Sequence, residues 1–175
     1  DVENGVKVKE QKTDEWQLLN PGGMLFSVLH LRADTFMAYE LLARRITGIA
    51  FETVEDASKR LAILAPMSVI AGKLSIHIAA NLLMTSNDGR GVAIGDTRVV
   101  ILGAGNAGAA AVHTALALRA DVTVITRVGP RLAALAHQLG SSARTMAMHP
   151  TTLTAATREA DVIIATVNIP GTRTP

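Results

Sequence analysis

The 175-residue sequence has no cysteine, few aromatic residues (3%) and no long uninterrupted apolar run. The absence of cysteine excludes disulfides and thiolate chemistry, and it is compatible with a reducing compartment. The segment 61–84 is strongly apolar, but a proline, a lysine, a histidine and an asparagine interrupt it. We therefore expect a buried helix there rather than a membrane span. No positively charged start followed by an apolar stretch opens the chain, so we expect a cytoplasmic protein.

Charge is also sparse, since charged residues make up 18% of the chain and the formal net charge is +2 at pH 7. The basic residues are scattered, which is typical of solvated surface. A protein that binds nucleic acid usually has a clustered basic face or aromatic stacking platforms, and neither is visible. We therefore expect no nucleic-acid partner, no direct insertion into a membrane and no metal site.

Strand and helix patterns alternate through the second half of the chain. A β-branched strand over 98–102 leads into a glycine-rich stretch, which opens an alanine-rich helix over about 107–119. The later elements are a strand over 121–126, a helix over 130–139, a helix over about 152–160 and a strand over 161–167. This alternation predicts a Rossmann-type α/β fold with a doubly wound parallel sheet.

The first half has a similar but less regular pattern. It predicts a short strand that ends near Lys9, a turn at 20–23, an apolar strand over 24–31, a helix capped by Asp34 and a strand over 46–54. We interpret residues 1–67 as part of a second α/β domain. Residues 68–86 are predicted to form a connecting helix that Ser68 caps, and residues 87–175 to form an incomplete dinucleotide-binding domain.

The glycine-rich stretch Gly103-Ala-Gly105-Asn-Ala-Gly108 directly follows a strand and directly opens a helix. In that setting the first glycine permits the tight turn, the second lets a pyrophosphate approach the main chain and the third lets the helix pack close to the strand. Free N–H groups and the helix dipole then favour an anion. The predicted phosphate-binding residues are Gly103, Gly105, Asn106, Ala107 and Gly108. The alternative is a glycine-rich turn that binds no ligand.

The end of the second Rossmann strand bears on the choice between NAD and NADP. A site for NAD usually has Asp or Glu there, about 20 residues after the loop, to bind the ribose hydroxyls. This chain has Thr126 and Arg127 at that point, and Arg127 together with Arg131 could pair with a 2′-phosphate. We therefore favour NADP over NAD, the alternative being that Arg127 is a solvated loop residue. Val167, at the end of the last predicted strand, is also expected at the cofactor site.

Seven motifs stand in one order along the chain: VKVKE at 6–10, LFSVLHL at 25–31, IAFETV at 49–54, LAPMS at 64–68 followed by Ala-Gly at 71–72, GRG at 89–91, the glycine loop, and IPG at 169–171. In that order they resemble the family of alanine dehydrogenases and nicotinamide nucleotide transhydrogenase α subunits. The resemblance covers nearly the whole chain. It implies a two-domain subunit with a part of the substrate domain first, a connecting helix and then a Rossmann domain, assembled as a homo-oligomer.

The resemblance also implies residue roles. Lys9 would bind the carbonyl and carboxylate of the substrate, and His30 would be the catalytic acid/base. Glu52 and Met67 would lie close to the substrate, and Ser68 would approach the nucleotide. The chain departs from the family's usual pattern at Gln11, where proline is common, in the short connection 91–99, and at Thr126. The family's substrate-binding arginine and catalytic aspartate belong to segments outside these 175 residues.

These features together predict an NAD(P)-dependent oxidoreductase that transfers hydride reversibly between the cofactor and an amino acid/2-oxo acid pair. Reductive amination needs a cation that polarises the oxo group and a proton carrier that works near neutral pH, and Lys9 and His30 supply those groups. Two alternatives stay open. One is a non-catalytic or split nucleotide-binding module related to the transhydrogenase α subunit. The other is an enzyme similar to N5-(carboxyethyl)ornithine synthase, which would keep the chemistry and change the amine.

Overall fold

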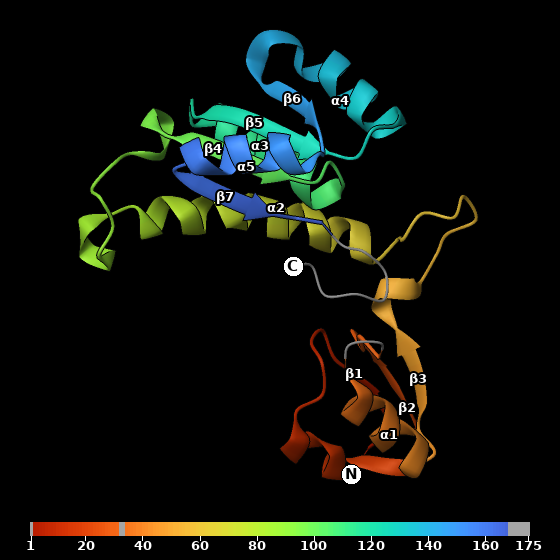
Figure 1. Ribbon diagram of the computed structural model, residues 1–175. Helices are drawn as coiled ribbons and strands as arrows, with labels where there is room; N and C mark the ends of the chain where they lie inside the picture. The colour runs from red at the N-terminus through yellow and green to blue at the C-terminus, as the bar shows by residue number, and fades with distance from the viewer. Residues whose placement is uncertain (1, 32–33, 168–175) are drawn as a thin grey trace. The chain divides into compact units, whose positions relative to one another are not determined.

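The computed structural model describes residues 2–31 and 34–167, and the IPG motif at 169–171 lies outside them (Figure 1). The chain divides into two compact units, of which the first runs to Ala65 and the second from Pro66 to Val167. Each unit contains its own parallel sheet. Among the residues described, no helix is long and apolar enough to cross a bilayer.

The first unit is a three-stranded sheet with one helix. Its elements are β1 (Val2–Val6), a 3-10 turn (Thr13–Leu18), β2 (Leu19–Ser27), α1 (Thr35–Ala43), β3 (Thr47–Ala50) and a second 3-10 turn (Phe51–Thr53). The strands are parallel in the order β1-β2-β3. Asp34 accepts a hydrogen bond from the Met37 N–H at 3.0 Å, so it caps α1 as the sequence predicts. The core consists of Trp16, Leu19, Leu25, Leu29, Met37, Leu41 and Ile46.

The predicted turn at 20–23 is wrong in form, because these residues lie within β2. Val2 pairs with Leu19 and Asn4 pairs with Met24, so residues 20–23 are an insertion into the ladder. Pairing with the same strand is parallel on both sides of the insertion, so the chain cannot reverse there. Gly22 has φ +83°, and its N–H donates to the Arg44 carbonyl at 2.9 Å. The turn-forming residues therefore make an irregular bulge of four residues opposite one, rather than a reversal.

The second unit is a four-stranded parallel sheet flanked by helices. Its elements are α2 (Leu64–Leu82, which begins at the unit boundary), two 3-10 turns (Thr85–Asn87 and Ile94–Asp96), β4 (Arg98–Leu102), α3 (Asn106–Ala117), β5 (Asp121–Thr126), α4 (Pro130–Leu139), a 3-10 turn (Gly140–Ser142), β6 (Arg144–Ala147), α5 (Pro150–Glu159) and β7 (Val162–Ala165). The strand order is β6-β5-β4-β7. This arrangement is the predicted Rossmann-type α/β fold. The sequence pattern does not predict β6, whose residues Arg-Thr-Met-Ala do not alternate clearly.

The connecting helix differs from its prediction in two respects. It begins at Leu64, so Ser68 lies inside it and is not its N-cap. Pro66 is tolerated as the third helical residue because the first-turn N–H groups have no partner within the helix. The second difference is the face that is buried, since the apolar residues that recur at helical spacing are not the buried ones. The buried side is formed by Gly72, Ile76 and Ala79, whereas Ile70, Leu74, Ile78 and Leu82 are 51–59% exposed within the described chain.

Candidate functional site

The glycine loop connects β4 to α3 at the carboxyl edge of the second sheet. Gly103 has φ +106°, a conformation that favours glycine, and a Cβ there would lie 2.7 Å from Thr166 Oγ1. A Cβ on Gly108 would lie 2.0 Å from the Gly103 carbonyl oxygen. The chain's own turn and packing therefore require both of these glycines.

Gly105 has no such internal reason to be glycine. Its φ is −76°, which any residue can adopt, and a Cβ there would meet only Arg131 Nη1, at 3.9 Å. Gly105 is also the N-cap of α3 and brings no side chain to the helix start. The first-turn N–H groups of α3 thus have no side-chain cap. At Gly105 no side chain keeps a ligand from approaching the main chain beside these N–H groups. This is the geometry that a pyrophosphate requires.

The structure shows one loop contact that sequence reasoning missed. Thr166, directly after β7, donates its N–H to the Leu102 carbonyl at 2.8 Å and its hydroxyl to the same oxygen at 2.9 Å. On the other side, the Gly103 N–H donates to the Ile125 carbonyl at 2.8 Å. Both neighbouring strands therefore hold the turn. Sequence reasoning names Val167, the next residue; a hydroxyl at the end of the strand beside the loop is the signal that points to Thr166.

The residues expected near the ribose lie at the same edge of this sheet. Thr126 is the last residue of β5, and the exposed Arg127 follows it. Arg131 is the second residue of α4, and its guanidinium approaches Gly105. Within the described chain neither arginine belongs to an ion pair. One of these unpaired cations, Arg131, therefore lies beside the open glycine Gly105, and the other, Arg127, directly follows Thr126.

Helix α2 packs closely on the start of α3. A Cβ on Gly72 would lie 2.1 Å from the Ala107 carbonyl oxygen, so this crossing needs a glycine. Ser68 precedes Gly72 by one helical turn and therefore lies on the same face of α2. Met67 and Ser68 are both half-buried, and both belong to the second unit.

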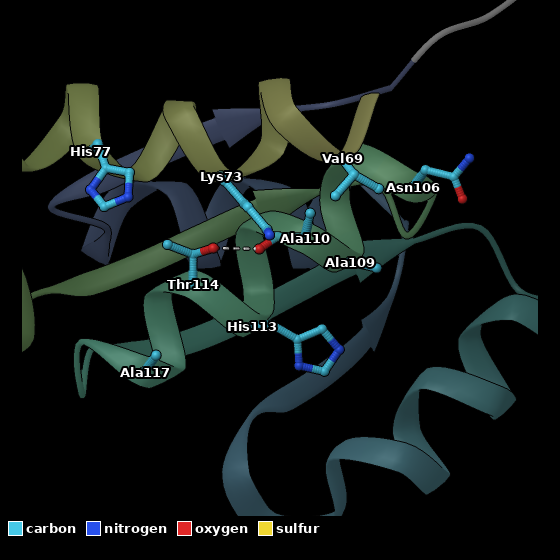
Figure 2. Close-up of a pocket in the computed structure, with 9 residues that line it drawn as sticks. All are labelled: Val69, Lys73, His77, Asn106, Ala109, Ala110, His113, Thr114 and Ala117. Atoms are coloured by element: carbon cyan, nitrogen blue, oxygen red, sulfur yellow. Dashed lines mark hydrogen bonds between the residues drawn. The ribbon is translucent and has the colours of Figure 1, made fainter. Parts of the chain in front are cut away.

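A cavity of about 570 Å³ also opens between α2 and α3 (Figure 2). Lys73 and His77 line it from α2, and His113 and three alanines line it from α3. Of the loop residues it contacts only Asn106 and none of the three fingerprint glycines. The cavity therefore adjoins the predicted phosphate site at Asn106 and extends away from its glycines.

In the first unit, Lys9 and His30 follow neighbouring strands at one edge of the sheet. β1 ends at Val6, so Lys9 lies in the loop three residues beyond the strand and not at its end. Its carbonyl accepts a hydrogen bond at 2.7 Å from the hydroxyl of Ser27, the buried last residue of β2. β2 also ends earlier than predicted, and His30 lies three residues after it with φ +45°. The Lys9 and His30 side chains are both exposed.

Two carboxylates flank the His30 imidazole. Glu10 Oε1 lies 3.5 Å from Nε2, and Glu52 Oε1 lies 3.9 Å from Nδ1. Glu52 in addition accepts the main-chain N–H groups of Leu29 and His30. The structure thus brings the predicted residues His30 and Glu52 together and adds Glu10, which the sequence analysis did not single out. In the described part of the chain, no three His, Asp or Glu side chains form a group that could hold a metal ion.

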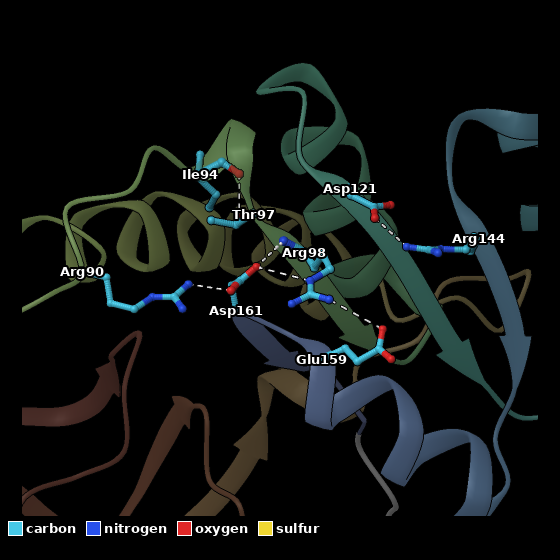
Figure 3. A network of polar contacts seen from close by, with 8 residues as sticks. All are labelled: Arg90, Ile94, Thr97, Arg98, Asp121, Arg144, Glu159 and Asp161. Carbon is cyan, nitrogen blue, oxygen red and sulfur yellow. Dashed lines mark hydrogen bonds and ion pairs between the residues drawn. The ribbon is translucent and has the colours of Figure 1, made fainter.

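The opposite, amino-terminal edge of the second sheet carries an ion-pair network (Figure 3). Asp161 accepts the Arg98 N–H at 2.8 Å and the Arg90 guanidinium at 2.5 Å. The Arg98 N–H, and after it the Arg90 guanidinium, lower the pKa of the Asp161 carboxyl below its ordinary value of 3.8. Arg144 and Asp121 pair at 2.6 Å at the starts of β6 and β5. This network lies at the other ends of the strands from the glycine loop, so we assign it to stability.

A strand, a glycine-rich turn and a helix at the carboxyl edge of a parallel sheet define the second unit as a Rossmann-type fold. The C-terminal-domain model of the alanine dehydrogenase/PNT family matches residues 75–175, and the N-terminal-domain model of that family matches residues 4–71. The chain therefore belongs to the alanine dehydrogenase/PNT family, as its motifs predict.

Individual relatives agree. The alanine dehydrogenase of Bilophila wadsworthia is 35% identical over 181 residues, which cover 100% of this chain and 48% of that protein. The alanine dehydrogenase of Methanococcus maripaludis is 36% identical over 176 residues, which cover 97% of this chain and 47% of that protein. A solved L-alanine dehydrogenase superposes with a TM-score of 0.83 at 37% identity, covering 99% of this chain and 50% of its own. A transhydrogenase from Sinorhizobium meliloti shares the fold, with a TM-score of 0.72 at 21% identity and coverages of 99% and 52%. The chain spans about half the length of the curated relatives it matches.

Proposed function

We propose that this chain carries the coenzyme-binding loop and the proton-transfer residues of an NAD(P)-dependent oxidoreductase that acts on an amino acid/2-oxo acid pair, as an alanine dehydrogenase does. The observation that carries the proposal is Gly105. It is a glycine that the fold itself does not require, at the open N-terminus of α3. A ligand that approaches the main chain closely explains it, and a dinucleotide pyrophosphate does so in this fold.

The residues present fit a nicotinamide dinucleotide. The first-turn amides of α3 would hold the pyrophosphate, and Thr166 keeps the turn in place through the Leu102 carbonyl. Ser68, on the face of α2 that meets α3, would approach the nucleotide. The nicotinamide, when bound, is the group that gives or accepts the hydride.

The first unit would supply the proton chemistry. The Lys9 ammonium would polarise the oxo group of the substrate, and the His30 imidazole would give or take the proton at that oxygen or nitrogen. Both lie at one edge of a parallel sheet, and the Ser27–Lys9 hydrogen bond ties the lysine loop to the strand that leads to the histidine. An exposed imidazole can exchange its proton with water between turnovers.

We further propose that the coenzyme is NADP rather than NAD. Thr126 replaces the carboxylate that would accept hydrogen bonds from both ribose hydroxyls. Arg127 directly follows it, Arg131 is the second residue of α4 and approaches Gly105, and neither belongs to an ion pair within the described chain. Two guanidinium groups are suited to a 2′-phosphate, which they can bind bidentately. Separate calorimetric titrations with NADPH and NADH test this choice, and equal or weaker affinity for NADPH would contradict it.

The activity is tested on the full-length protein with pyruvate, ammonia and each reduced coenzyme. We expect amination of the 2-oxo acid, detected as loss of reduced-coenzyme absorbance. His30→Ala should abolish turnover and leave coenzyme affinity within about twofold, because His30 belongs to the other unit from the glycine loop. His137→Ala is the matched control, since His137 is exposed on α4 and should not affect turnover. Coenzyme binding without turnover would favour the non-catalytic module instead.

A further inference from the structure

His30 has an unusual main-chain conformation. Its φ of +45° lies in the left-handed region, which residues other than glycine adopt uncommonly, histidine, asparagine and aspartate more often than the rest. The conformation is held on the carbonyl side, where the His30 oxygen accepts the Asp34 N–H at 3.1 Å. Asp34 is in turn the N-cap of α1, so that side is tied to a helix. Such backbone strain persists only where surrounding contacts enforce it.

The contacts on the amino side come from one carboxylate, mainly from one of its oxygens. Glu52 Oε1 accepts the His30 N–H at 2.7 Å and the Leu29 N–H at 3.2 Å. The second oxygen adds a contact of 3.3 Å to the Leu29 N–H. Glu52 lies 22 residues from His30 in the sequence, on the 3-10 turn that follows β3, and its side chain is only 16% exposed.

The turn that carries Glu52 is itself fixed. The Phe51 ring packs edge-on against Phe26 of β2, with ring centroids 4.4 Å apart. On the other side of Glu52, the Thr53 hydroxyl donates to the Ala50 carbonyl at 3.0 Å. The carboxylate is therefore presented to the 29–30 main chain from a position set by β3 and β2.

Glu52 does not hold the imidazole directly. Its Oε1 is 3.9 Å from His30 Nδ1, beyond hydrogen-bond reach, and the ring is 55% exposed. We propose that Glu52 is a positioning residue that acts on His30 through the main chain: its Oε1 holds residues 29 and 30 in the left-handed turn from which the imidazole projects. The catalytic consequence rests on the proposed role of His30 as proton carrier, whereas the structural consequence does not.

Two substitutions separate acceptor geometry from charge. Glu52→Gln loses the charge but keeps a carbonyl oxygen at the same reach, and one oxygen is enough for both N–H groups. Glu52→Asp keeps the charge but shortens the side chain by one methylene, which withdraws the acceptor. Glu52→Ala removes both. Glu55→Ala is the matched control, since the Glu55 carboxylate pairs only with exposed Lys59 within the described chain.

The first readout is amide hydrogen exchange at Leu29 and His30, measured by NMR on the 175-residue chain. We expect exchange at both amides to quicken at least about tenfold in Glu52→Ala and Glu52→Asp, and to stay within about threefold of the parent in Glu52→Gln and Glu55→Ala. The Ile46 amide, which donates to the Leu41 carbonyl, should not change and reports that the unit is still folded. If Glu52→Ala does not fold, the Asp and Gln variants still decide. Unchanged exchange in Glu52→Asp, or loss of protection in Glu52→Gln, would overturn the proposal.

The second readout is turnover by the full-length protein. Glu52→Asp should lower kcat at least about tenfold with KM within about twofold, and Glu52→Gln should restore most of kcat. If kcat instead follows the charge at position 52, so that Glu52→Asp is active and Glu52→Gln is inactive, the result contradicts positioning through the main chain. If exchange behaves as expected but His30→Ala remains active, the proton-carrier assignment fails and the positioning of His30 stands. If His30→Ala is inactive while all Glu52 variants keep full kcat and exchange, the assignment stands and the positioning fails.

Discussion

Gly105→Ala and Gly108→Ala add the same methyl group to the same loop, yet we expect them to impair different properties. A Cβ at Gly105 would meet only the far end of Arg131, at 3.9 Å, and the φ of −76° suits alanine. A Cβ at Gly108 would lie 2.0 Å from the Gly103 oxygen, which belongs to the main chain and is backed by Thr166. The first methyl occupies the place of a ligand, and the second overlaps the protein.

The magnitudes follow from these contacts. For Gly105→Ala, alanine is a poorer N-cap than glycine by roughly 0.5 kcal/mol, but it lowers the entropy of the unfolded chain by roughly 0.4–1 kcal/mol, so the free energy of unfolding should change by less than about 0.5 kcal/mol. The methyl should displace a pyrophosphate from at least two amides, each worth about 1.5–3 kcal/mol, which weakens coenzyme binding by roughly 100-fold or more. For Gly108→Ala, overpacking against fixed main chain should cost about 1–3 kcal/mol or more of stability.

The assay combines urea unfolding of each variant with calorimetric titration by NADPH and NADH. Gly105→Ala should unfold at the same urea concentration as the parent protein and bind neither coenzyme detectably. Gly108→Ala should unfold at a clearly lower urea concentration. Undiminished coenzyme affinity in Gly105→Ala would refute the claim that a ligand explains this glycine. A large loss of stability in the same variant would refute it equally, because the fold would then require the glycine after all.

The remaining predictions concern charge. Arg127→Asp should shift preference from NADPH toward NADH by at least about tenfold, because it removes a cation beside the 2′-phosphate and adds an acceptor for the ribose hydroxyls. Arg158→Asp, at an exposed position on α5, is the control and should not shift it. Parallel titrations with both coenzymes measure the two variants, and unchanged relative affinities in Arg127→Asp would remove the 2′-phosphate argument. Asp161→Asn should lower stability at neutral pH. The folded state depresses the Asp161 pKa, so the contribution is complete above the ordinary value of 3.8 and is lost as pH falls through the lower folded-state pKa. Denaturation curves of parent and variant should therefore converge in acid, and a gap that persists there would contradict the ion-pair explanation.

Local patterns were sufficient for the first strands and the glycine loop of the second unit, although they did not predict β6. The strand 98–102, the glycine loop and the strand 121–126 can be predicted because β-branched runs, glycine spacing and helix starts depend on residues within a few positions of one another, and the structure has these elements. The family could likewise be identified from seven short motifs in order, and the family models confirm it. The same local reasoning fails at residues 20–23. Residues 20–23 are of types that favour turns, but β2 pairs with β1 on both sides of them, so they form a bulge instead.

Contacts between residues far apart in the sequence follow from the three-dimensional fold alone. The order of the three loop glycines predicts a separate role for each, but only the folded chain supplies the contacts: a Cβ on Gly103 or Gly108 would overlap Thr166 or the Gly103 carbonyl, whereas a Cβ on Gly105 would meet only the end of Arg131. Thr166 reaches Leu102 across 64 positions, and Glu52 reaches His30 across 22. Such contacts depend on strand order, register and the point at which each strand ends. These are properties of the whole sheet, and no window of the sequence contains them.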